Sequence, residues 1–111
     1  MSLTWSDVRS KLPDVVILLV SPDQDRLNRL KEAIQSAGFR TISAAALDQA
    51  WTRTDFFDFG GVVIDYELRN DIAAAAFRQR FITLMPNEDA TPESVAMELA
   101  SVFGRGSELV H

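Results

Sequence analysis

Six consecutive apolar residues, Val15 to Val20, constrain the fold of this chain more than any other stretch of its sequence. Pro13 and Pro22 bound the run, and a short apolar run between such residues predicts a strand that is buried on both faces. Strands of this kind belong to parallel sheets that carry helices on each side. The run is far too short to span a bilayer, and it lacks the basic start and the cleavage site of a signal peptide.

Helical and strand patterns alternate along the rest of the chain. Trp5, Val8 and Leu12 recur at helical spacing, which predicts a first short helix over residues 3–12. Further helices are expected over 23–37, 47–57, 71–79 and 92–103, and further strands over 39–44, 62–64 and 81–85. We expect Trp51 and Val102 on the inward faces of their helices. A helix followed by repeated strand–helix units predicts an α/β fold with a parallel sheet.

The composition excludes several classes of site. The chain of 111 residues has no cysteine, and its only histidine is the terminal His111. Disulfides, thiol catalysis and metal sites with cysteine or histidine ligands are therefore not expected. The net charge is −5 and there is no basic run, which argues against direct binding of nucleic acid or of a membrane surface. We expect a cytoplasmic domain whose partner is another protein.

An acid stands at the tip of the third expected strand. The stretch reads GGVVIDYELRN, so that Asp65 follows the β-branched run Val62 to Ile64 directly. In open α/β sheets, ligands bind beyond the carboxyl ends of the strands. Asp65 therefore stands where a functional residue would stand, although a solvated turn or a helix cap would also explain an acid there.

The segment VVILLVSPDQDRLNRLKEAIQSAGFRTISAAALDQAW and the stretch GGVVIDYEL resemble the receiver (CheY-like) domain of bacterial two-component response regulators. The resemblance covers residues 14 to about 70 and places Asp65 at the phosphoacceptor position. It implies a flavodoxin-like, three-layer αβα fold, with about four strands in place of the usual five because about one β/α unit is missing. The expected organisation is an N-terminal helical segment (1–13), a receiver-like domain (14–104) and a tail (105–111).

The acidic pocket of the family is altered in this sequence. In a working receiver, the resemblance implies, Mg²⁺ is held by an acidic pair, by the phosphoacceptor and by a backbone carbonyl two residues beyond it. Ser21 and Pro22 occupy the positions of the acidic pair, and neither supplies a carboxylate. Asp23 is one residue late. Asp23, Asp65 and Glu67 are the remaining candidate metal set, and Asp25 could assist through water.

The second half departs further from the family. A receiver carries a Ser or Thr after its fourth strand and a Lys-Pro pair after its fifth, whereas this chain offers the single strand FITLMP. Thr83, Met85 and Pro86 stand at or near these positions, and the only lysines in the sequence are Lys11 and Lys31. Either the unit before FITLMP is deleted, or the end of the domain is truncated.

Three hypotheses follow. The first is a degenerate receiver: a protein-interaction module of two-component signalling that acts without phosphorylation, is not an enzyme and needs no cofactor. Its partner would be a histidine kinase, an output domain or a second copy of the chain. The second is a receiver that accepts phosphate on Asp65 through an atypical Mg²⁺ site. The third is a small nucleotide- or flavin-binding protein, which is disfavoured because the loop Ser21-Pro22-Asp23-Gln24 lacks glycine.

Overall fold

The computed structural model describes residues 15–103, so the helix expected over residues 3–12 lies outside the described residues. The described residues form a single parallel sheet with the strand order β2-β1-β3-β4. Its strands are β1 (Val16–Val20), β2 (Arg40–Ala44), β3 (Gly61–Ile64) and β4 (Ile82–Leu84). The helices are α2 (Gln24–Ser36), α3 (Leu47–Arg53), α4 (Ile72–Arg80) and α5 (Pro92–Val102), and a 3-10 turn, η1 (Tyr66–Leu68), follows β3.

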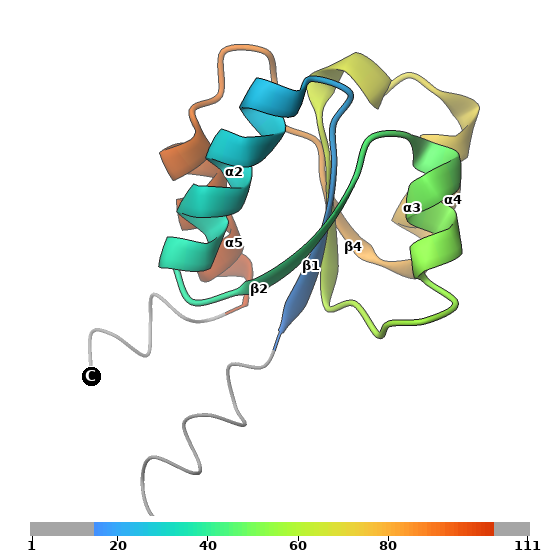
Figure 1. Cartoon of the computed structure of the whole chain (residues 1–111), viewed down its shortest axis with the longest axis horizontal. Coiled ribbons are helices and arrows are strands. Elements are labelled where there is room, and N and C mark those ends of the chain that lie inside the picture. Colours follow the sequence, from blue (N-terminus) through green and yellow to red (C-terminus); the bar gives the residue numbers. More distant parts are fainter. Residues whose placement is uncertain (1–14, 104–111) are drawn as a thin grey trace, which may run out of the picture.

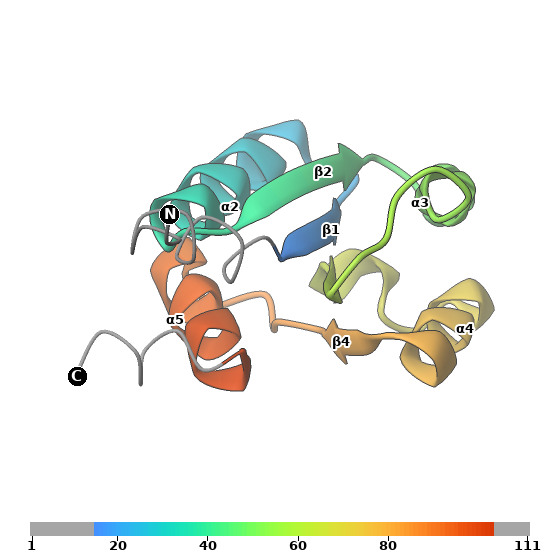
Figure 2. The ribbon, with the colours of Figure 1, turned by 90° about the horizontal axis from the view of Figure 1, so that it is seen from below.

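Helices cover both faces of the sheet, as Figures 1 and 2 show. The chain runs outward from β1 to β2 and then returns past β1 to β3 and β4. Because parallel crossovers are right-handed, this reversal places α2 on one face and places α3 and α4 on the other. α5 returns to the first face, where it packs against α2. The expected flavodoxin-like αβα architecture, with four strands, is confirmed for the described residues.

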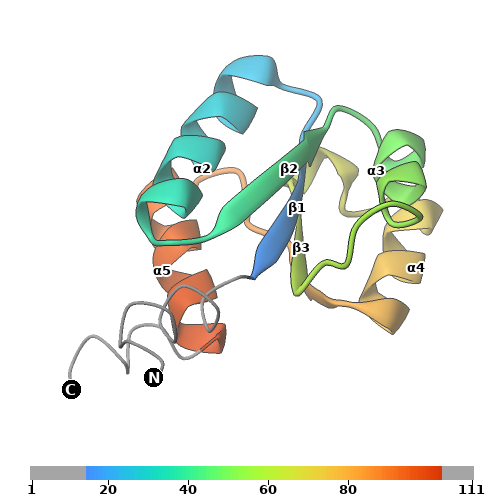
Figure 3. The same cartoon turned by 60° about the horizontal axis from the view of Figure 1, so that its bottom comes forward.

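The central strand β1 explains the apolar run Val15 to Val20. Ile17 and Leu19 point into the core beneath α2 and α5, whereas Leu18 and Val20 point into the core beneath α3 and α4. All four side chains are fully buried. β1 lies between β2 and β3 (Figure 3), so that both of its edges are paired and both of its faces are covered. A strand in this position has no exposed side for a polar residue.

Capping residues stand at the starts of three helices. Asp23, Asp71 and Thr91 cap α2, α4 and α5, and in each case a side-chain oxygen accepts a backbone N–H of the first turn. Gly38 follows α2 with φ of 101°, a conformation that suits glycine after the end of a helix. Caps of this kind depend on neighbours in sequence, which is why they can be predicted.

The expected end of α3 and the expected faces of two helices were wrong. α3 ends at Arg53 rather than at residue 57, because the backbone N–H groups of residues 54–56 donate to carbonyls three residues back instead of four. Trp51 is 37% exposed instead of buried, and its ring lies edge-on to Phe77, with the ring centres 4.9 Å apart. On α5, Val102 is 44% exposed, because the buried face of that helix is formed by Val95, Ala96 and Leu99.

Gly60, just before β3, and Gly61, its first residue, make room for neighbouring side chains. A Cβ atom on Gly61 would lie 2.9 Å from the ring of Phe103, and one on Gly60 would lie 2.6 Å from a methyl group of Val15. Any larger residue would force these neighbours to move. The pair GG therefore marks a close approach at the start of the strand that carries Asp65. In the described part of the chain, no helix is long and apolar enough to cross a membrane.

Candidate functional site

The candidate site lies at the carboxyl edge of the sheet, where β1 and β3 end side by side. Asp65 follows β3, and its backbone N–H donates to the carbonyl of Val20 at 3.0 Å. Ser21 follows β1, and its hydroxyl donates to Oδ2 of Asp65 at 2.8 Å. Both residues are fully buried. Asp65 is therefore positioned by the regular pairing of two central strands, and it is not a solvated turn residue.

The carboxylate of Asp65 is surrounded by donors. Nε of Arg26 lies 2.8 Å from each of its two oxygens, and the backbone N–H of Tyr66 donates to Oδ1 at 2.9 Å. Together with the Ser21 hydroxyl, these groups satisfy both oxygens of the carboxylate. A buried carboxylate is costly unless it is paired and hydrogen-bonded, and this one is both.

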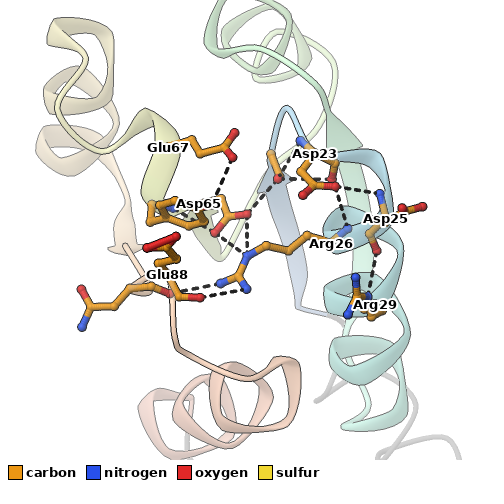
Figure 4. A network of polar contacts seen from close by, with 10 residues as sticks. Asp23, Asp25, Arg26, Arg29, Asp65, Glu67 and Glu88 are labelled. Carbon is orange, nitrogen blue, oxygen red and sulfur yellow. Dashed lines mark hydrogen bonds and ion pairs between the residues drawn. The ribbon is translucent and has the colours of Figure 1, made fainter.

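Arg26 was not among the site residues expected from the sequence, yet it pairs with Asp65. It lies in the first turn of α2 (Figure 4). Its side chain is only 15% exposed. Its guanidinium also lies over the ring of Tyr66, 5.4 Å from the ring centre. A signal was present in the sequence, because a cation in the first turn of a helix opposes the helix dipole and usually has a specific anionic partner.

Two acidic side chains of the candidate metal set are engaged in hydrogen bonds within the chain. Oδ1 of Asp23 accepts the N–H groups of Asp25 and Arg26, and the side chain of Glu67 accepts the hydroxyl of Tyr66 at 3.1 Å. Asp25, the proposed assistant, is exposed on α2. In residues 15–103, no three histidine or acidic side chains form a group that could hold a metal ion.

These residues do not fit a Mg²⁺ ion. Mg²⁺ requires near-octahedral oxygen ligands, usually with carboxylates among them. The hydroxyl of Ser21 already donates to Asp65. Pro22 is exposed and has no side-chain oxygen. Arg26 is bonded to both oxygens of Asp65, so a fixed cation stands where a metal would bind. The charge of Asp65 is paired by a side chain of the same chain.

Of the altered switch positions, only Thr83 lies on β4, and Met85 and Pro86 follow the strand. Thr83 pairs in register with Val62, and its hydroxyl donates to the carbonyl of Phe81 at 3.1 Å. The last pair of β3 and β4 is Val63 with Leu84. If the same register continued for two more residues, Pro86 would lie opposite Asp65. Met85, which is half-buried, packs against the core beneath α3 and α4. Neither Met85 nor Pro86 can donate a charged hydrogen bond to a phosphoryl group.

Three carboxylates near Tyr66 favour its protonated form: Glu67, Glu88 and Asp65. The hydrogen bond to Glu67 raises the pKa of its hydroxyl above the usual value, and loss of hydration and the charges of Glu67, Glu88 and Asp65 raise it further. The neutral phenol is thereby favoured in the folded chain. This contribution to stability is fully present below about pH 10 and is lost as the pH rises through the pKa of the folded state.

Replacing Glu67 by glutamine should therefore lower the pKa of Tyr66 toward about 10. The chain has a single tyrosine, so the absorbance of the phenolate during an alkaline titration reports this residue alone. Glu98→Gln, at an exposed position of α5, is the matched control and should leave the midpoint unchanged. Equal midpoints for the native chain and Glu67→Gln would show that the hydrogen bond does not hold the proton.

The architecture has a counterpart among solved structures. HP1043, described as an orphan response regulator of H. pylori, superposes with a TM-score of 0.61 at 9% sequence identity, over 80% of this chain and 96% of that chain. No protein-family model matches the chain, and no curated protein matches it in sequence. At this identity the likeness shows the fold: residues 15–103 adopt a receiver-like, flavodoxin-like αβα architecture.

Proposed function

We propose that this chain, which has the fold of a response-regulator receiver domain, is a degenerate receiver that acts as a protein-interaction module without phosphorylation. The observation that carries the proposal is the pairing of Asp65, at the phosphoacceptor position, with Arg26. An aspartate whose two oxygens are engaged by a guanidinium and two further donors is a poor nucleophile. The module is not an enzyme, requires no metal and works in the cytoplasm.

The chemistry of phosphoryl transfer supports this proposal. Transfer depends on cations and donors that are already placed around the reacting oxygens. Here the acidic pair is replaced by Ser21 and Pro22, and the two lysines of the sequence, Lys11 and Lys31, both lie outside the stretch that follows β4. Losing one such donor typically costs roughly 10²–10³ in rate. Arg26 would also have to leave Asp65 before a phosphoryl group could approach.

The partner is expected to contact the helices rather than Asp65. The candidates are a histidine kinase, an output domain or a second copy of this chain. Several large apolar side chains are exposed on the helical layers and could contribute to such a contact: Trp51, Phe56, Phe57, Ile72 and Met97. We propose no direct contact with nucleic acid or with a membrane.

A titration with Mg²⁺ and beryllofluoride, followed by NMR amide shifts around Asp65, tests the proposal. We expect flat shifts for Ser21, Asp65 and Tyr66 at millimolar metal, because Arg26 already neutralises the carboxylate. Asp65→Ala serves as the control for binding elsewhere. Saturable shifts that disappear in Asp65→Ala would instead identify a phosphorylatable receiver with an atypical metal site.

A further inference from the structure

Arg26 contacts two separate parts of the site at once. Its Nε engages Asp65 after β3, while its Nη2 donates to the backbone carbonyl of Asn87 at 3.1 Å and its Nη1 approaches that of Glu88 at 3.5 Å. Asn87 and Glu88 belong to the β4–α5 loop, which we define as residues 85–91. Figure 4 shows the guanidinium between Asp65 and the stretch that carries Glu88. One side chain of α2 therefore joins the end of β3 to a loop more than 60 residues away in sequence.

Between Asn87 and Asp89, the β4–α5 loop faces the segment that joins β3 to α4 across mostly polar side chains. A hollow of about 550 Å³ lies there, lined by Tyr66, Arg69, Asn70, Asn87, Glu88 and Asp89. Across it, Nη1 of Arg69 donates to the side-chain oxygen of Asn87 at 2.7 Å. Polar contacts, rather than close packing, therefore hold this part of the loop in place.

From this geometry we propose that Arg26 is a built-in latch, by which the charge of Asp65 sets the conformation of the β4–α5 loop. The carboxylate fixes the guanidinium on one side, and the rigid fork of the guanidinium holds the loop carbonyls on the other. The latch gives the chain a permanent internal connection between the end of β3 and an exposed loop surface. The inference goes beyond the proposed function and does not depend on a signalling role.

Hydrogen exchange at the amide of Ala90 provides a local test. That amide donates to the carbonyl of Asn87, the same oxygen that accepts from Arg26. We expect Arg26→Lys to speed its exchange about tenfold, because an ammonium can keep the charge pair but cannot bridge both partners. Arg29→Lys, one turn further along α2, is the matched control and should change nothing.

Asp65→Asn is the second variant, and it should speed exchange at Ala90 by a similar factor because the guanidinium loses its anchor. The double variant, Arg26→Lys with Asp65→Asn, should exchange no faster than the faster single variant, because both changes break one connection. Amides of Leu19 and Val63 report global opening in every sample. Unchanged exchange at Ala90 in a folded Arg26→Lys or Asp65→Asn chain, or additive effects in the double variant, would overturn the latch.

Discussion

Replacing Arg26 by methionine is expected to lower the free energy of unfolding by about 3–5 kcal/mol. Methionine fills a similar space but leaves Asp65, which is fully buried, without its cation. A buried charge that loses its partner retains its full cost of desolvation. Urea unfolding followed by tryptophan fluorescence, with the native chain as reference, measures the loss.

Two further variants separate the charge effect from lost packing. Arg29→Met removes an exposed arginine from the same helix, and its effect should stay within about 0.5 kcal/mol. Adding Asp65→Asn to Arg26→Met should recover most of the lost stability, because the uncompensated charge is then gone. The amide oxygen still accepts from the N–H of Tyr66, and the Ser21 hydroxyl can accept from the new amide NH2 instead of donating. If the double variant is no more stable than Arg26→Met alone, the buried charge is not the cause.

Truncating Phe77 to alanine should cost about 3–5 kcal/mol. Its ring is fully buried on α4, beneath Trp51, and it packs beside Phe81 with ring centres 6.3 Å apart. The variant would lose the transfer energy of the ring and would leave a cavity between α3 and α4. Chemical unfolding at fixed pH measures the change.

Phe56→Ala is the matched control for this second substitution. Phe56 is 74% exposed in the turn after α3, so the same change in side chain should alter the stability by less than about 0.5 kcal/mol. Equal effects at positions 56 and 77 would show that the layer of α3 and α4 is packed differently from this structure.

Much of the site's framework could be predicted from local sequence. The run Val15 to Val20 and the stretch ending at Asp65 are parallel strands, and parallel strands end at a common edge of the sheet. The position of Asp65 therefore followed from its own neighbours in the chain. The shorter α3 could not be predicted, because the apolar pattern continues past Arg53. The helix ends there because the following backbone N–H groups donate to carbonyls three residues back.

The order of strands and helices along the chain and the acid at the tip of β3 could be predicted from the sequence, because each depends on residues close together in the chain. Only the tertiary structure decided that Asp65 is paired with Arg26. These residues are 39 positions apart, and they meet because strand pairing brings the end of β3 beside the start of α2. Apolar periodicity records which face of an element is buried. It does not record which charged side chains meet across the edge of the sheet, and here that meeting decides what the acid can do.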